Sequence, residues 1–181
     1  MCPYVDPQTI HNPATGGIAP ATWGDGVRDA VEYLARNRPH ARVYHSANQS
    51  IATGTPTALA FDSERVDVGG MHDTVTNNSR LTIPTGEAGF YHIGGCVRWA
   101  YNTTGYRSLD IRVGGTSVIA RTAHDTLVGS AIGTDQTVGC DYQLAAGNYV
   151  ELFVTHNAGA ALNVSVASPQ SPEFWCHWVS L

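Results

Sequence analysis

Two His-Asp neighbours, His72-Asp73 and His124-Asp125, come closest to catalytic chemistry in this sequence. A histidine oriented by a carboxylate can act as the general base for a serine nucleophile. The chain has no GxSxG, HExxH, GxxxxGK[ST] or GxGxxG motif, however. Two such neighbours among eight histidines are also expected by chance. The sequence therefore predicts no catalytic residue and favours a binding or structural protein over an enzyme.

Carboxylates and thiols are the next groups that could hold a metal ion. Oxygen ligands suit calcium, and four acids lie close together in sequence: Asp62, Glu64, Asp67 and Asp73. They lack the glycine-centred spacing of a calcium loop, so the sequence favours solvated turn carboxylates. The four cysteines show no CxxC or Cys/His ligand spacing and are expected to be buried thiols: Cys2, Cys96, Cys140 and Cys176. We expect no metal site and no cofactor.

Tyr101 and Tyr106 flank the polar segment 102–105, Asn-Thr-Thr-Gly. Two aromatic side chains beside such a segment could stack on a sugar ring. The same residues could also pack a hairpin, and the sequence favours the hairpin. A host surface glycan stays open as a partner.

Composition excludes several classes of partner. The chain has 181 residues, 43% of them hydrophobic and only 14% charged, and its net charge is −5. All ten basic residues are arginine and none forms a basic run, so nucleic acid is not expected as a partner. No apolar window approaches the ~20 residues of a membrane span, and the first ten residues lack the features of a signal peptide. A surface with so few charges favours a protein that assembles with copies of itself or with other subunits.

Short runs of β-branched and aromatic residues, separated by Gly, Asn and Pro turns, indicate a mainly β chain from residue 41 onward. The clearest are the segments RLTIPTGEAGFYHIGGCVRWAY (80–101) and LAAGNYVELFV (144–154). The predicted strands are 41–47, 56–61, 64–68, 79–83, 89–101, 106–113, 117–123, 126–141 with a break, 148–156, 160–167 and 173–181. Gly114-Gly115 predicts a hairpin turn.

The first 38 residues differ from the rest. Residues 1–22 contain four prolines and no periodicity, which predicts an extended arm. Residues 23–38 predict an amphipathic helix capped by Thr22 or Asp25 and ended by Pro39. One apolar stripe runs along it: Trp23, Val27, Val31 and Leu34. The stripe could pack on the chain's own β domain or attach to another protein, and the sequence favours attachment, with Trp23 as the main contact.

The order of several β elements over residues 41–181 resembles the globular heads of complement and tumour-necrosis-factor (TNF)-like proteins. The matching residues are Phe61, Leu81-Thr82-Ile83-Pro84, Gly89-Phe90-Tyr91, Leu144, Gly147, Tyr149-Val150 and Phe174. This resemblance implies a TNF-like jelly-roll β-sandwich that forms tight homotrimers. Strands with apolar residues on both alternations then suggest a trimer core drawn from Tyr91, Trp99, Tyr149, Phe153, Trp175 and Trp178.

Residues 12–37, NPATGGIAPATWGDGVRDAVEYLARN, resemble the start of small virion proteins of tailed bacteriophages. That resemblance implies a phage structural protein, assembled in the host cytoplasm and displayed on the virion surface. We expect a trimeric head decoration protein, a cement or minor capsid protein, whose arm binds the major capsid protein. The alternative is a tail-fibre or receptor-binding tip that joins a tail protein and recognises a host glycan. The short arm leaves no shaft, which favours decoration.

Overall fold

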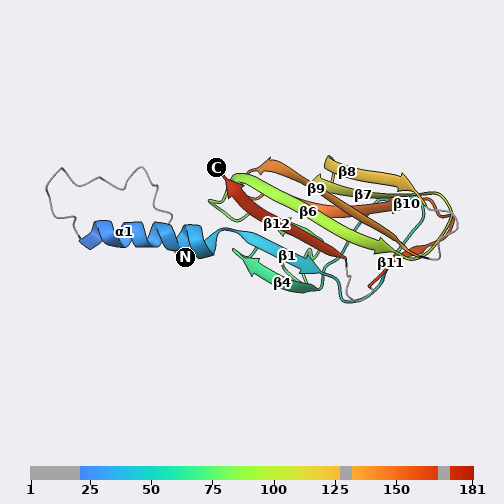
Figure 1. Cartoon of the computed structure of the whole chain (residues 1–181), viewed down its shortest axis with the longest axis horizontal. Helices are drawn as coiled ribbons and strands as arrows, with labels where there is room; N and C mark the ends of the chain where they lie inside the picture. Colours follow the sequence, from blue (N-terminus) through green and yellow to red (C-terminus); the bar gives the residue numbers. More distant parts are fainter. Residues whose placement is uncertain (1–20, 127–131, 167–171) are drawn as a thin grey trace. The chain divides into compact units, whose positions relative to one another are not determined.

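The computed structural model describes residues 21–126, 132–166 and 172–181, with the backbone alone for residues 21–23, 35 and 36. The chain divides after Arg38 into two compact units, residues 1–38 and residues 39–181 (Figure 1). Residues 1–20, which make up nearly all of the predicted arm, lie outside the described residues. Each unit is therefore considered by itself.

The first unit contains helix α1 (Ala21–Glu32), which continues as a short π-helical segment, η2 (Tyr33–Asn37). The described residues are helical from Ala21 onward, so Thr22 and Asp25 both lie inside the helix and neither is the expected cap. Asp25 instead pairs with Arg28, one turn along, at 3.2 Å. Arg38 is extended, with φ −62° and ψ 132°, because the ring of Pro39 disfavours helical backbone in the preceding residue. Pro39 therefore ends the helix as predicted.

The second unit is built from antiparallel strands. Within the described residues these are β1 (His40–Tyr44), β2 (Gln49–Ile51), β3 (Thr57–Ala58), β4 (Ser63–Val68), β5 (Arg80–Thr82), β6 (Gly89–Trp99), β7 (Tyr106–Val113), β8 (Ser117–Asp125), β9 (Thr134–Leu144), β10 (Tyr149–His156), β11 (Leu162–Val164) and β12 (Glu173–Ser180). The mainly β class predicted from the sequence is confirmed.

The strands form two sheets. In the seven-stranded sheet the order is β2-β11-β6-β12-β1-β4, and β9 pairs along the other edge of β6. In the five-stranded sheet the order is β3-β10-β7-β8, and β5 also pairs with β10. Figure 1 shows β12, β6 and β9 in one layer with β7, β8 and β10 in the other. The chain crosses repeatedly between the layers, as in a jelly roll.

Side chains from both sheets meet in one hydrophobic core. Phe61 and Phe174 stack in it with ring centroids 5.9 Å apart. Along β6, the fully buried side chains are those that point between the sheets, and the period of two follows from the pleat of the strand. The larger buried side chains of the core are Ile51, Leu59, Phe61, Met71, Leu81, Ile83, Tyr91, Ile93, Trp99, Leu109 and Phe174.

Two adjacent glycines allow side chains of other strands to approach both faces of β6 closely. A Cβ added at Gly95 would lie 2.6 Å from a methyl carbon of Leu152 on the opposing sheet. A Cβ added at Gly94 would lie 2.5 Å from the indole ring of Trp175 on the outward side. Because successive residues of a strand point to opposite faces, the Gly94-Gly95 pair serves the core and the outer surface at once.

The predicted strands differ from the observed ones mainly at short edge elements. The predicted strand 56–61 is reduced to β3, because Leu59 and Phe61 bond instead to single carbonyl groups outside a ladder. The short strand β2 was not predicted, since its Gln-Ser-Ile sequence carries no alternating pattern. In the predicted segment 126–141, the observed strand is β9, and residues 127–131 lie outside the described residues.

We expect Gly95→Val to lower the free energy of unfolding by about 2 to 3 kcal/mol, because its side chain would overlap Leu152 across the core. Denaturant unfolding at fixed protein concentration measures the loss. Ala123→Val adds two methyl groups at an exposed position of β8 and should change the free energy by less than about 0.5 kcal/mol. Equal losses in the two variants would show that the sheets do not approach closely at Gly95.

Candidate functional site: the outward face of the seven-stranded sheet

The outward face of the seven-stranded sheet is defined here by the side chains of β1, β12, β6 and β9 that point away from the core. Antiparallel register places these side chains in rows that run across the four strands. Three successive rows, each containing one residue from every strand, make up the candidate site.

The first row carries three histidines. His40 on β1 pairs with His177 on β12, which pairs with His92 on β6, and Asp141 on β9 ends the row. The rings of His40 and His177 meet edge to face with centroids 6.1 Å apart, and Nδ1 of His92 lies 2.8 Å from Oδ1 of Asp141. Burial, the neighbouring histidines and Arg42 lower the pKa of His177 below its usual value. We call His40, His92 and His177 the histidine row.

The second row is a flat apolar strip. Trp175 on β12 lies opposite Gly94 on β6, which lies opposite Gly139 on β9. With no side chains at the two glycines, the indole of Trp175 rests directly on the strand. The guanidinium carbon of Arg42 lies 5.9 Å from the centre of the indole, on the β1 side. The indole ring of Trp175 therefore lies at the surface beside two residues without side chains.

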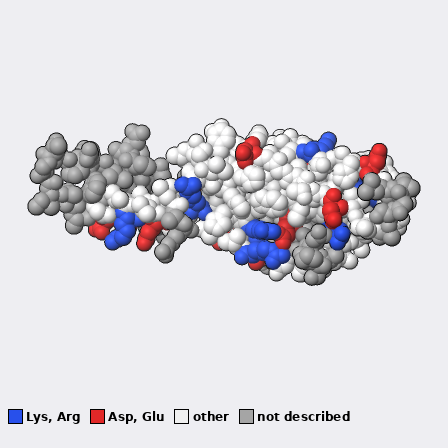
Figure 2. Space-filling view, in the orientation of Figure 1, with Lys and Arg blue, Asp and Glu red and all other residues white. Residues whose placement is uncertain are grey.

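The third row centres on a buried carboxylate. Glu173 accepts hydrogen bonds from Nε of Arg42 and Nε of Arg65, each at 2.6 Å. Arg65 in turn lies over the ring of Tyr44, with its guanidinium carbon 4.6 Å from the centroid. Figure 2 shows these charges gathered over β1 and β4, while the surface over β12 and β6 is largely uncharged. The charge of Glu173 is thus fully matched within the protomer.

The predicted trimer-core residues are not brought together. Tyr91 and Trp99 are fully buried inside the protomer, so their assignment to a trimer core is corrected. Trp178 also packs against the core, since it pairs with Tyr91 in register and shares its face. Of the predicted set, Trp175 alone lies on the outward face of the seven-stranded sheet.

The other two predicted trimer-core residues lie on the outward face of the five-stranded sheet. The guanidinium of Arg80 covers Tyr149 at 4.0 Å from the ring centroid, and that of Arg112 covers Phe153 at 4.1 Å. A guanidinium stacked on a ring shields its apolar face from water. Tyr149 and Phe153 therefore find their partners within the chain.

A buried carboxylate completes this second face. Asp110 accepts two hydrogen bonds from Arg121, each at 2.7 Å, one from Arg112 at 3.0 Å and one from Ser108 at 2.8 Å. Burial alone would raise the pKa of Asp110, but these hydrogen bonds and the Arg121 charge outweigh it and lower the pKa. This polar network covers the middle of the outward face of the five-stranded sheet, where Tyr106 and Val118 remain exposed.

The predicted attachment stripe lies in the first unit. Val27 is half-buried within that unit, while Val31 and Leu34 are 57% and 51% exposed. The side chain of Trp23 lies outside what the structure describes, although its backbone is helical. Attachment through this stripe stays a prediction.

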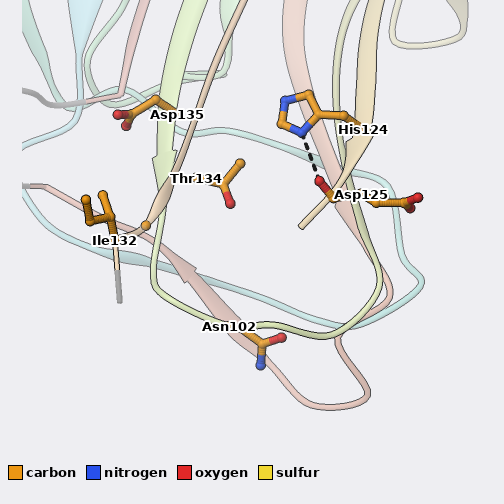
Figure 3. Close-up of a pocket in the computed structure, with 7 residues that line it drawn as sticks. Asn102, His124, Asp125, Ile132, Thr134 and Asp135 are labelled. Carbon is orange, nitrogen blue, oxygen red and sulfur yellow. Dashed lines mark hydrogen bonds between the residues drawn. The ribbon is translucent and has the colours of Figure 1, made fainter. Parts of the chain in front are cut away.

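Neither His-Asp neighbour is arranged for catalysis. In Figure 3, Nδ1 of His124 contacts the backbone oxygen of Asp125, at 3.4 Å, while the Asp125 carboxylate points away from the ring. The ring of His72 lies between Glu64, at 2.9 Å from Nδ1, and the carbonyl oxygen of Asn78. Both histidines have other contacts in place of the catalytic partner that the sequence offered.

An open cavity of about 430 Å³ lies beside His124, at the end of the sandwich where β8 and β9 approach each other (Figure 3). Its lining residues are Asn102, His124, Asp125, Ile132, Gly133, Thr134 and Asp135. Tyr101 and Tyr106, the predicted sugar-stacking residues, are both exposed, and Tyr106 begins strand β7 of the β7–β8 hairpin. Glycan binding here stays a prediction.

A buried arginine positions the loop that forms one wall of this cavity. Arg107 is fully buried and donates to the carbonyl oxygens of Thr104 and Tyr106, at 3.0 and 2.9 Å, and to Oδ1 of Asn102 at 3.3 Å. Its guanidinium also lies 5.7 Å from the centre of the Trp99 ring. Burial lowers the pKa of Arg107. This side chain was not singled out from the sequence, because a strand arginine is normally exposed.

The four acids considered for calcium are each bonded to groups of the chain. Their partners are Ser46 and Ser63 for Asp62, His72 for Glu64, the N–H groups of Met71 and His72 for Asp67, and those of Val75 and Thr76 for Asp73. The backbone N–H groups lower the pKa of Asp73. Among residues 21–126, 132–166 and 172–181, no three His, Cys, Asp or Glu side chains are placed to hold one metal ion.

Three thiols fall in the described residues, and all are free: Cys96, Cys140 and Cys176. Burial raises the pKa of each, most strongly that of Cys176. They are therefore protonated and unreactive near neutral pH. Cys2 lies outside the described residues.

Comparison with known proteins gives the fold. Eiger TNF from S. frugiperda superposes with a TM-score of 0.56 at 13% identity, covering 81% of this chain and 96% of that one. Murine APRIL at pH 5.0 superposes with a TM-score of 0.56 at 12% identity, covering 78% and 99%. No protein-family model and no curated protein sequence matches the chain. Likeness at this identity concerns the fold alone, and it confirms a TNF-like jelly-roll β-sandwich.

In the described part of the chain, neither the length nor the hydropathy of any helix is sufficient for a membrane span.

We expect Glu173→Gln to lower the free energy of unfolding by about 2 to 3 kcal/mol, because it leaves two guanidinium groups facing an uncharged buried amide. Chemical denaturation at one fixed protein concentration measures this loss. Asp135→Asn removes the partner of Arg98 at a more exposed ion pair and should cost less than about 1 kcal/mol. Similar losses in the two variants would contradict the central role given to Glu173.

Proposed function

We propose that this chain is a non-catalytic structural protein that assembles as a homotrimer through the outward face of the seven-stranded sheet. The observation that carries the proposal is the difference between the two outward faces. On the five-stranded sheet, arginines of the same chain cover the aromatic rings. On the seven-stranded sheet, Trp175 rests on glycine backbone and Phe90 is 41% exposed on the same face.

Such a surface suits contact with a second copy of the chain. Exposed apolar side chains on a flat, weakly charged face are typical of protein–protein interfaces. The shared fold with the TNF structures and the sequence resemblance to homotrimeric complement and TNF-like heads support threefold assembly. In a closed ring of three protomers, each contact uses this face of one protomer. No face is then left for a fourth protomer to bind.

The full chain should sediment with three times its protomer mass of 19.3 kDa at micromolar concentration. Phe90→Ser removes an apolar contact from every interface, so the concentration for half-assembly should rise about tenfold or more. Sedimentation velocity over a dilution series measures both quantities.

Tyr101→Ser is the matched control, because Tyr101 is 49% exposed and belongs to none of the strands β1, β12, β6 and β9 that define the face. It should leave assembly unchanged. A monomeric wild-type chain, or equal effects of the two substitutions, would contradict assembly through this face.

We further propose that the trimer is a bacteriophage virion protein, fixed to the head as a decoration by its first 38 residues. The resemblance of residues 12–37 to phage virion proteins supports this role. So does the division of the chain after Arg38, with Val31 and Leu34 exposed on the helix of the first unit. The receiving surface would belong to the major capsid protein.

Val31→Ser combined with Leu34→Ser should reduce the amount of protein retained on washed particles about tenfold, because both apolar contacts of the helix are lost. The melting temperature of the sandwich should not change. Glu32→Ser, on the polar side of the helix, is the control and should bind normally. Normal retention of the double variant would refute attachment through this stripe, including the role predicted for Trp23.

Copy number separates head decoration from the alternative, a receptor-binding tip on the tail. Quantitative electrophoresis of purified particles should give hundreds of copies for a decoration and a few to tens for a tip. The exposed Tyr101 and the cavity beside Asn102 are the features that would favour a glycan-binding tip. A low copy number would therefore favour a receptor-binding tip over a head decoration.

A further inference from the structure

We infer that the open cavity at the end of the sandwich binds an uncharged sugar residue, which Asn102, His124 and Thr134 hold through its hydroxyl groups. This inference goes beyond the proposed assembly and does not rest on it, because every lining residue belongs to one protomer. The cavity volume of about 430 Å³ lies in the lower part of the range of small-molecule sites, about 300 to 1,000 Å³, and suits a mono- or disaccharide.

The cavity is lined by three segments that lie apart in the sequence. Asn102 lies in the loop after β6, His124 near the end of β8, and Thr134 at the start of β9 (Figure 3). Thr134 pairs with Trp99 in the seven-stranded sheet. His124 pairs with Arg107 in the five-stranded sheet. Since paired residues share a face and both partners are fully buried, Thr134 and His124 lie on the inner sides of their sheets.

Each of the three side chains has a hydrogen-bonding group without a partner in the described part of the chain. Oδ1 of Asn102 accepts from the N–H of Thr104 at 2.8 Å, which leaves the two N–H groups of the amide to donate. Nδ1 of His124 faces the backbone oxygen of Asp125 at 3.4 Å, so the proton of the neutral ring lies on Nδ1 and Nε2 is an acceptor. The hydroxyl group of Thr134 can donate and accept.

The loop that carries Asn102 is fixed within the protomer. Arg107 is fully buried and donates to Oδ1 of Asn102 at 3.3 Å, and its charge polarises the amide, which strengthens the N–H groups as donors. Thr126, which follows β8, donates its N–H to the oxygen of Gly105 at 3.1 Å. A site held in this way needs little ordering on binding, and this favours affinity for a small ligand.

The charges around the cavity disfavour an acidic ligand. Two of its lining residues are carboxylates, Asp125 and Asp135. Two arginines lie beside the lining: Nε of Arg98 pairs with Asp135 at 3.1 Å, and Arg107 is fully buried. A phosphate or carboxylate group would meet like charge there without an accessible cation to bind it. The ligand that fits is therefore uncharged.

The lining also disfavours a metal ion and a purely apolar ligand. Within the residues that the structure describes, no three His, Cys, Asp or Glu side chains are placed to hold one metal ion. Ile132 is the one large apolar side chain among the lining residues, and it is 68% exposed. A sugar combines hydroxyl groups that donate and accept with C–H groups that can lie against such a side chain. Its chemistry therefore matches the lining best.

Titration of the full chain with the methyl glycosides of glucose, galactose, mannose and N-acetylglucosamine, followed by ligand-observed NMR, tests the inference. At least one of them should bind saturably with a Kd on the order of 1 mM, as expected for a small ligand held by few hydrogen bonds. N-acetylneuraminic acid, which carries a carboxylate, should bind more weakly than that glycoside.

Asn102→Asp separates contact with the sugar from support of the loop. The new carboxylate keeps an acceptor for Thr104 and Arg107 but has no N–H group, so the Kd should rise at least about tenfold while the melting temperature does not fall. Asn148→Asp is the matched control, because Oδ1 of Asn148 likewise accepts a backbone N–H, that of Ala145, in the turn that follows β9. It adds the same charge beyond the other end of β9 and should bind normally.

Thr134→Val removes the hydroxyl group and keeps the shape of the side chain. Loss of one hydrogen bond to the sugar should raise the Kd about tenfold. Thr82→Val makes the same change at an exposed position of β5 outside the lining, and it should bind as the wild type does.

The inference is overturned if none of the four glycosides binds saturably. Binding that persists unchanged in Asn102→Asp and Thr134→Val overturns it too, since the sugar would then lie elsewhere on the chain. Equal losses in the variants and their controls, or tighter binding of N-acetylneuraminic acid than of every neutral glycoside, have the same consequence. A monomeric chain that still binds the sugar supports the inference while contradicting the homotrimer, so the two proposals fail separately.

Discussion

The close approach of side chains to β6 is the constraint on which the rest of the structure depends. Gly95 admits Leu152 from the opposing sheet, and Gly94 admits Trp175 on the outer surface. Since β6 lies between β12 and β9 and is the longest strand of its sheet together with β9, its position fixes both the depth of the core and the flatness of the outer strip. The same two residues therefore connect the packing of the sandwich to the shape of the proposed contact face.

The charged side chains are arranged differently on the two outward faces. On the five-stranded sheet, Asp110 holds Arg112 and Arg121 in place, and Arg112 then covers Phe153. On the seven-stranded sheet, the matching network around Glu173 reaches toward β1 and β4. Its Arg42 lies 5.9 Å from the centre of the Trp175 indole, which also rests on the backbone of Gly94. Buried ion pairs contribute little net stability, but they decide which apolar rings stay accessible. In this protein they cover Tyr149 and Phe153 on the five-stranded sheet, while Phe90 on the seven-stranded sheet stays exposed.

Much of the fold follows from local sequence patterns, whereas the site does not. Alternating apolar residues and glycine turns predicted the long strands β6, β7 and β10 nearly to the residue. Tyr91 and Trp99 were placed in the correct strand but on the wrong face. Polar residues on the opposite alternation, His92 and Arg98, were the signal that could have corrected this. The histidine row could not be predicted, because it depends on the pairing of three strands that lie far apart in the chain.

The ionisable groups of the sandwich differ in the contacts that each makes within the protomer. Asp110, Glu173 and Arg107 are each held by several hydrogen bonds within the folded protomer. Burial raises the pKa of each of the three thiols further above neutral pH. The contacts of the histidine row are of another kind: the rings of His40 and His177 meet edge to face, and Nδ1 of His92 lies 2.8 Å from Oδ1 of Asp141. These contacts lie on the outward face of the seven-stranded sheet and not in the hydrophobic core.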